Sequence, residues 1–327
     1  MPTLKRPKRP TSATRPAPTG GTLVGWRGVT VRVPEDWSPV LVSGEGPSGH
    51  LRIASPDSRV LEIKWKEVRG SASVPANLEN YRRTLERIAR RNRVELTWRL
   101  RPKQLTAIRP QRQQPIPYTW EATHRAYGVI WHCPHCLRMV TAEVAGDPDA
   151  DFSVVPDILR SISDHAEGDW ITWALYGLEF EAPKRFQLER TRLKTGHVEF
   201  QFRHAGRILW AERWGLARLA LKQTDLKTWW TAQWAERLGR YRVEWEEAPV
   251  DGHRGLRLIG TERPLPAFTR LLGSLVALQW PAWCLRGYVW ECPQSNRILA
   301  VTAMQRRGDR VVDEIVARMR CHRDRAP

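Results

Sequence analysis

The sequence lacks the features that mark a membrane-spanning or disulfide-rich protein. Its longest uncharged stretch, Leu271 to Leu285, is shorter than the roughly 20 apolar residues that a spanning helix needs. Five cysteines in 327 residues are too few for a disulfide scaffold. No apolar segment typical of a secretory signal is visible near the N-terminus. We therefore expect a cytoplasmic protein without a membrane span.

The common catalytic patterns are also missing. No Gly-x-Ser-x-Gly, His-Glu-x-x-His or Walker sequence occurs. Residues 44–49 match Gly-x-Gly-x-x-Gly, but a strand is expected after them, whereas a dinucleotide site needs a helix there. We therefore predict a protein that is not an enzyme, with no catalytic residues and no nucleotide cofactor.

Positive charge, by contrast, is abundant, with 53 Lys+Arg against 35 Asp+Glu and a formal net charge of +18. Residues 1–21 form a basic, proline-rich arm without acidic residues, which we expect to be disordered. Arginines in residues 82–93 recur at helical spacing opposite an apolar face, an arrangement that suits phosphate contacts. The main hypothesis is sequence-independent binding of nucleic acid, or of an acidic partner, through Lys5, Arg6, Lys8, Arg9, Arg83, Arg87, Arg90, Arg91, Arg101 and Lys103.

Tryptophan supplies an alternative hypothesis. The chain has 17 Trp but only 6 Tyr and 6 Phe. Most Trp residues fall in expected strands and helices, which predicts packing in the core or between domains. Because Trp and Arg are enriched at interaction hot spots, the chain could instead be a protein–protein scaffold or assembly subunit. An expected helix over Leu271–Trp283 would add to its contact surface.

An internal repeat organises the chain. Residues 128–140 resemble residues 287–299, and residues 154–165 resemble residues 311–322. Further matches keep the same order, one of them placing Trp65 opposite Trp214.

Three regions follow from this repeat: the arm (1–21), copy 1 (22–165) and copy 2 (166–327). Hairpin-connected strands with two helices predict an α+β fold, in which each copy is an antiparallel-sheet domain packed with two helices. In copy 1, residues 101–125 are polar and proline-rich and are expected to form a long surface loop.

The order of elements resembles the PsbP-like α/β superfamily. The resemblance rests on an opening strand that ends in a proline turn before an aromatic residue, as in Pro34–Trp37 and Pro183–Phe186. A middle helix and a closing hairpin before a C-terminal helix complete the pattern. The resemblance implies a sandwich fold and the role of a non-catalytic adaptor or assembly factor.

One short motif carries possible metal chemistry. Cys133 and Cys136, in the segment His-Cys-Pro-His-Cys, supply half of a tetrahedral zinc site. The alternatives are a redox pair and a structural hairpin that merely buries Cys133. Because Ser295 replaces the second cysteine in copy 2, no site is expected there. His165 and His322 are expected at the ends of the closing helices, where they complement the helix dipole.

Overall fold

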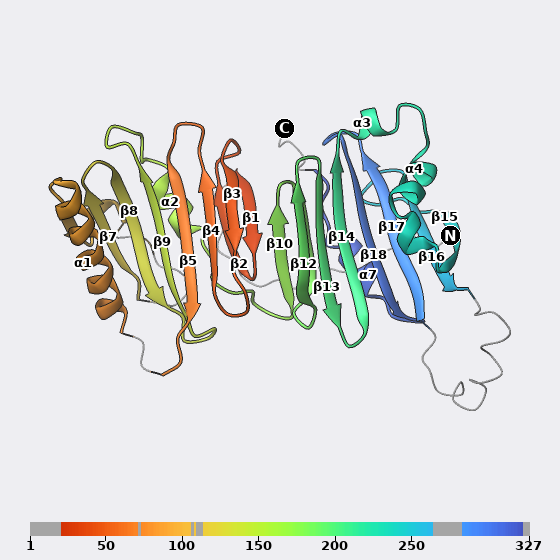
Figure 1. Cartoon of the computed structure of the whole chain (residues 1–327), viewed down its shortest axis with the longest axis horizontal. Coiled ribbons are helices and arrows are strands. Elements are labelled where there is room, and N and C mark those ends of the chain that lie inside the picture. The colour runs from red at the N-terminus through yellow and green to blue at the C-terminus, as the bar shows by residue number, and fades with distance from the viewer. Residues whose placement is uncertain (1–20, 71–72, 106–107, 109–113, 264–282, 323–327) are drawn as a thin grey trace. The chain divides into compact units, whose positions relative to one another are not determined.

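The structure is a computed structural model, and it describes residues 21–70, 73–105, 108, 114–263 and 283–322. The described residues form two compact units, one within residues 21–176 and the other within residues 177–322 (Figure 1). The basic arm and residues 264–282, which hold nearly all of the expected helix over Leu271–Trp283, lie outside the described residues. No helix among the described residues is long and apolar enough to cross a bilayer.

The first unit is built on a seven-stranded antiparallel sheet of order β3-β4-β5-β9-β8-β7-β6. Its strands are β3 (Ser38–Ser43), β4 (Gly49–Ala54), β5 (Val60–Glu67), β6 (Thr97–Leu100), β7 (Ile116–Glu121), β8 (Arg125–His132) and β9 (Arg138–Gly146). A separate hairpin of β1 (Thr22–Trp26) and β2 (Val29–Val33) extends to β10 (Trp170–Leu175) through β1.

Two helices contact strands of this unit. The helix α1 (Val74–Asn92) begins at Ser73, whose hydroxyl accepts a hydrogen bond from the amide of Ala76. Its Leu78 packs against Tyr118, Ile130 and Met139. The short helix α2 (Val155–Arg160) contacts β2, β8 and β9. A single turn of 3₁₀ helix spans Lys103–Leu105.

The second unit repeats this strand order. Its sheet runs β12-β13-β14-β18-β17-β16-β15, which is the first order with every strand replaced by its counterpart. The strands are β11 (Leu178–Pro183), outside the seven, and β12 (Gln187–Lys194), β13 (His197–His204), β14 (Arg207–Gly215), β15 (Tyr241–Glu247), β16 (Gly255–Glu262), β17 (Trp283–Cys292) and β18 (Arg297–Arg306). The described helices are α3 (Ala217–Ala220), α4 (Leu226–Gln233), α5 (Ala235–Leu238) and α7 (Val311–Val316).

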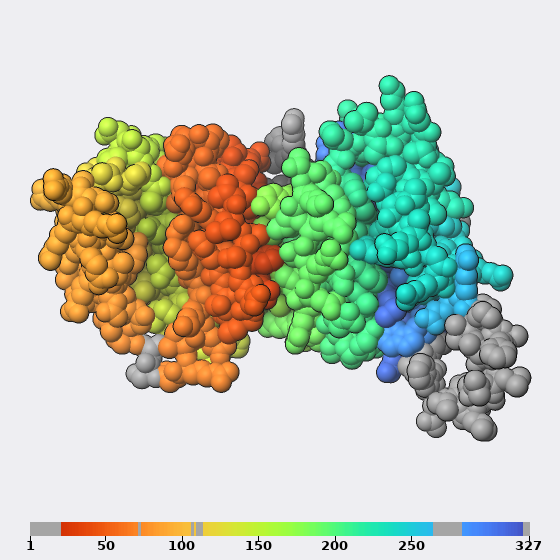
Figure 2. All heavy atoms as spheres, in the orientation of Figure 1, coloured from red at the N-terminus to blue at the C-terminus, as the bar shows by residue number. Residues whose placement is uncertain are grey.

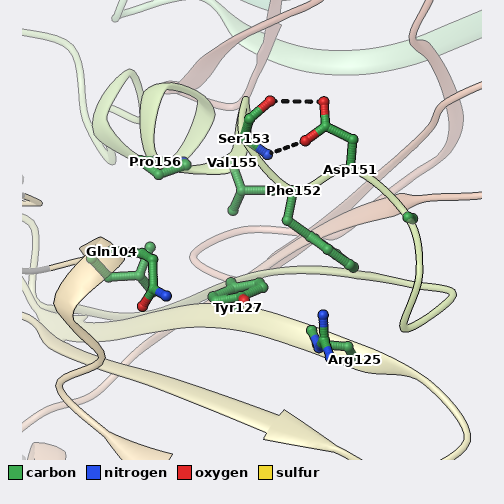
Figure 3. A pocket seen from close by; sticks show the side chains of 10 residues that line it. Gln104, Arg125, Tyr127, Asp151, Phe152, Ser153, Val155 and Pro156 are labelled. Atoms are coloured by element: carbon green, nitrogen blue, oxygen red, sulfur yellow. Dashed lines mark hydrogen bonds between the residues drawn. The ribbon is translucent and has the colours of Figure 1, made fainter.

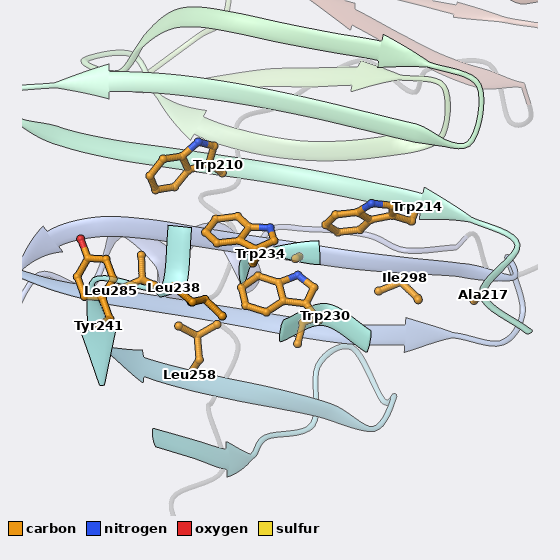
Figure 4. Close-up of a cluster of buried hydrophobic side chains, with 12 residues drawn as sticks. Trp210, Trp214, Ala217, Trp230, Trp234, Leu238, Tyr241, Leu258, Leu285 and Ile298 are labelled. Atoms are coloured by element: carbon orange, nitrogen blue, oxygen red, sulfur yellow. The ribbon is translucent and has the colours of Figure 1, made fainter. Parts of the chain in front are cut away.

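Tryptophan fills the core of the second unit, as the sequence predicts. Trp210 and Trp214 on β14 lie against Trp230 of α4 and Trp234, which follows it (Figure 4). Trp230 and Trp234 are stacked with ring centroids 4.7 Å apart. Each buried Trp removes about 150–250 Å² from water. This cluster therefore fixes α4 and α5 on one face of the sheet.

The expected α+β class with two packed helices per copy is wrong. The structure is mostly β, with three antiparallel sheets, two of them of seven strands. Strand β7 lies inside residues 101–125, so the long surface loop expected there is wrong for Ile116–Glu121. The outer strands β3 and β12 also escaped prediction, because neither carries the regular apolar alternation of a half-buried strand. The closing helices α2 and α7 are short.

The pairing of Trp65 with Trp214 is also wrong, by one residue. Trp65 lies opposite Val140 in the sheet, whereas Arg213 lies opposite Leu299. Val140 and Leu299 hold the same place in the two closing hairpins. Trp65 therefore corresponds to Arg213, and a one-residue shift places the two tryptophans on opposite faces of their sheets.

Candidate metal centres and binding surfaces

The predicted cysteine pair lies in a cluster of metal-binding side chains, here called centre 1. Cys133 follows β8, and Cys136 lies in the turn that leads to β9. Asp164 and His165 come from the segment after α2, and the four ligand atoms lie within 4.8 Å of one another. His165 Nδ1 is 3.5 Å from Cys133 Sγ. Cys133 and Cys136 are free cysteines.

Hydrogen bonds position the acidic member of centre 1. The indole N–H of Trp131 donates to Asp164 Oδ2 over 2.7 Å, and Arg138 donates to the backbone carbonyl of Asp164. Burial raises the pKa of the Cys136 thiol to about 12. A bound cation would reverse this effect, because it stabilises the thiolate directly.

A second cluster, here called centre 2, lies in the other unit. It consists of His253, Cys292, Cys321 and His322, whose ligand atoms are also within 4.8 Å of one another. His322 Nδ1 is 3.5 Å from Cys292 Sγ, 3.1 Å from Cys321 Sγ and 3.2 Å from His253 Nε2. Burial lowers the pKa of His253 and raises that of Cys321. The imidazole of His253 is therefore held neutral, the form that binds metals.

The two centres occupy equivalent places in the repeat. Cys133 directly follows β8 and Cys292 ends β17, each the first strand of a closing hairpin, and His165 and His322 both follow the last described helix of their unit. The expected role of these histidines at helix ends is wrong, since α2 ends at Arg160 and α7 at Val316. In both units the chain instead turns back after the helix and brings the histidine to the hairpin cysteine.

Sequence reasoning identified only part of these clusters. It found Cys133 and Cys136 from their local spacing, but it missed Asp164 and His165. It also missed centre 2, because Ser295 stands where the second cysteine of centre 1 lies. The available signal was the repeat itself: His165 and His322 align, and Cys321 stands where copy 1 has Asp164.

A third polar cluster already contains its own cation. Arg237 lies 3.0 Å from Glu199 and 3.3 Å from Glu212, and the indole of Trp234 donates to Glu212 over 2.8 Å. His197 Nε2 is 3.7 Å from the same carboxyl. Burial raises the pKa of Glu212 to about 7. The guanidinium stands where a metal would otherwise be needed, which makes this a structural ion cluster.

The predicted basic contacts have mixed surroundings. Arg83 forms an ion pair with Glu79 on the same helix, 3.0 Å away. Arg87, Arg90 and Arg91 are exposed on α1, which lies at the surface in Figure 2, and no described residue pairs with them. The structure also exposes Arg101 and Lys103, while the predicted contacts Lys5, Arg6, Lys8 and Arg9 lie outside the described residues.

An outer strand of the first sheet exposes apolar side chains. β3 has the sequence SPVLVS, and Val40 and Leu41 keep 56% and 42% of their surface exposed. Among the described strands, β3 pairs with β4 alone, and the indole N–H of Trp26 donates to the Ser43 carbonyl at its end over 3.0 Å. Leu41 lies opposite Arg52 of β4, which in turn lies opposite Glu62 of β5. These three side chains therefore share one face of the sheet.

A hollow of 430 Å³ in the first unit offers no catalytic set. Its walls include Arg125 and Tyr127 of β8 and residues 150–153, 155 and 156 (Figure 3). The Asp151 carboxylate accepts hydrogen bonds from the amide and the hydroxyl of Ser153, both over 2.8 Å. The hydroxyl thus donates directly to a carboxylate, and no histidine is among the described lining residues, so they do not form a Ser-His-Asp arrangement.

No protein-family model and no curated protein matches the chain. It is similar to two solved structures of the immunity protein TplEi of T6SS from Pseudomonas aeruginosa. The complex with "L" peptide is 11% identical, with 93% of this chain and 98% of that chain covered and a TM-score of 0.34. The apo structure is 9% identical, with 92% and 97% covered and a TM-score of 0.32. At these TM-scores, neither the fold nor the function of this chain follows from the likeness.

Proposed function

We propose that the chain is a non-enzymatic protein-binding protein that pairs an extended segment of its partner with strand β3. The uncharged, exposed edge of β3 is the observation that carries this proposal. An outer strand presents unpaired backbone N–H and C=O groups, to which a partner strand can add. Val40 and Leu41 would supply apolar contacts beside those backbone hydrogen bonds.

The other outer strands support the choice of β3. Proteins protect exposed sheet edges with charged side chains, which oppose pairing with another chain. In the two seven-stranded sheets, β6, β12 and β15 each carry at least one charged residue, whereas β3 carries none. Pro39 and the register shift before Leu41 confine new pairing to the second half of β3.

The charges beside β3 indicate the chemistry of the partner. Arg52, Lys64 and His50 lie 3.6, 2.5 and 3.7 Å from a single carboxylate, that of Glu62. This group keeps an excess of positive charge next to Leu41. A partner strand with apolar and acidic side chains would match both features, in keeping with the net charge of +18.

A peptide-binding assay tests this function. We expect a fluorescein-labelled extended peptide of alternating Val and Glu to bind, by fluorescence anisotropy, more tightly than the matching Val–Lys peptide. Leu41→Glu should weaken binding at least tenfold, because it places a charge on the edge. Gln187→Glu adds the same charge to the exposed β12 and should leave binding unchanged. Equal binding by the two variants would contradict the proposal.

Nucleic-acid binding remains a second candidate because Arg87, Arg90 and Arg91 are exposed together on α1. If all three contact phosphates, their joint replacement by Gln should reduce the slope of log K against log salt for duplex DNA by about 2.7. Binding of random-sequence DNA that is absent, or that does not depend on salt, would exclude this function.

A further inference from the structure

Centre 2 draws its four side chains from three separate parts of the second unit. His253 lies in the turn between β15 and β16, Cys292 ends β17, and Cys321 with His322 follows α7. His253, Cys292 and Cys321 are buried. Three segments thus bring nitrogen and sulfur atoms to one point inside the protein.

Hydrogen bonding alone does not account for this convergence. One nitrogen, His322 Nδ1, faces Cys292, Cys321 and His253 at 3.5, 3.1 and 3.2 Å. A ring nitrogen has either one hydrogen or one lone pair, so it serves one such contact well. Ligands at zinc bond lengths of about 2.0–2.3 Å are roughly 3.3–3.8 Å apart at the corners of a tetrahedron. The observed distances are close to these edges.

The ligand types narrow the choice of metal. Two sulfurs and two imidazole nitrogens form a Cys₂His₂ set, which is typical of structural zinc. Calcium and magnesium prefer oxygen ligands. The nearby carboxylate of Asp251 lies 3.6 Å from Cys321 Sγ, where it contacts a ligand. The set also leaves no open position for a substrate.

A buried indole supplies an independent indication. Trp290 holds the place of Trp131, whose N–H donates to Asp164 in centre 1. Trp290 is 1% exposed, and its indole N–H lies against the side chain of Cys321 as its hydrogen-bonding neighbour. A metal-bound thiolate at Cys321 would accept this N–H, as groups around a metal site commonly do for its ligands.

We propose that His253, Cys292, Cys321 and His322 bind one structural Zn²⁺ ion. The ion would fasten the segment after α7 to the closing hairpin and to the β15–β16 turn. This proposal is independent of the binding role of β3, which lies in the other unit. It places a metal in copy 2, where no site was expected because Ser295 replaces the second cysteine of the motif.

Metal content of the full chain tests the proposal. Zinc is measured by mass spectrometry after gel filtration without chelator. Relative to the unaltered chain, Cys321→Ser should lose about one zinc per chain. Cys284→Ser is the control, because Cys284 is also a buried free cysteine but belongs to neither centre. Equal zinc content in the chain and in Cys321→Ser would overturn the proposal.

A second measurement applies if Cys321→Ser fails to fold. Cys133→Ser/Cys136→Ser removes the thiolates of centre 1 and leaves centre 2 intact. Loaded with Co²⁺, this folded variant should show tetrahedral d–d bands and thiolate-to-cobalt charge transfer, and Zn²⁺ should displace them. A folded variant without these bands would overturn the proposal, whatever the result with Cys321→Ser.

Discussion

The stacked pair Trp230 and Trp234 provides a matched test of the second unit's core. Both indoles are buried, and they contact each other in the same cluster. They differ in one respect. Trp234 Nε1 donates to the buried carboxylate of Glu212 over 2.8 Å, whereas Trp230 Nε1 has no hydrogen-bond partner among the described residues. Replacing each by Phe separates packing from hydrogen bonding.

The expected costs follow from this difference. Trp→Phe at either position removes part of a buried ring and leaves a small cavity, which should cost about 1–2 kcal/mol in unfolding free energy. Trp234→Phe also removes a hydrogen bond to a carboxyl group, which adds about 1.5–3 kcal/mol. The unfolding free energy of Trp234→Phe should therefore be lower than that of Trp230→Phe by about 1.5–3 kcal/mol.

Hydrogen exchange measured against urea provides the readout, because it reports on each unit separately. The amides of β17 and β18 should show the larger loss of protection in Trp234→Phe. Amides of the first unit serve as the internal control and should not change in either variant. A difference between the variants below about 0.5 kcal/mol would refute the role of the Glu212 hydrogen bond.

Three further predictions concern pH, a cap and a close contact. The pKa of Glu212 is raised from 4.5 to about 7, so its contribution to stability is present below pH 4.5 and lost as pH rises through about 7. Glu212→Gln should remove this part of the pH dependence in urea unfolding, and an unchanged profile would contradict it. Ser73→Ala should destabilise α1 by about 1 kcal/mol in hydrogen exchange, because it removes the bond from Ala76, and undiminished protection would count against the cap. Gly128→Ala places a Cβ 2.4 Å from the Tyr118 ring and should cost about 1–3 kcal/mol in thermal unfolding, so an unchanged midpoint would refute that contact.

The repeat and its strongest strands could be predicted from the sequence. Central strands such as β8 and β17 are rich in apolar residues, and the matched hairpins 128–140 and 287–299 reveal their equivalence. The outer strands β3 and β12 could not be found in this way. β3 and β12 bury little on either face, so their sequences show no period of two, and tertiary pairing alone makes them strands. β7 was missed for another reason: it is an inner strand with Tyr118 fully buried, but its segment is polar and proline-rich.

The members of the two centres also differ in whether the sequence could predict them. Cys133 and Cys136 are three residues apart, so a local pattern reveals them. His253 reaches Cys292 and His322 only because the β15–β16 turn and the segment after α7 meet at the hairpin. The spacing of these residues in the sequence does not predict that contact. The alignment of His165 with His322 was the usable signal. The closing helices were predicted to extend as far as these histidines, so both were explained as helix-end residues that complement the dipole.

Protection of β3 amides tests the central claim most directly. Hydrogen exchange of the full chain is followed by NMR with and without a saturating amount of the Val–Glu peptide. The claim predicts slower exchange for backbone amides of β3 after Pro39, because a partner strand would accept their hydrogen bonds, with β12 unchanged. Binding of the peptide without any slowing in β3, or with slowing confined to α1, would contradict it.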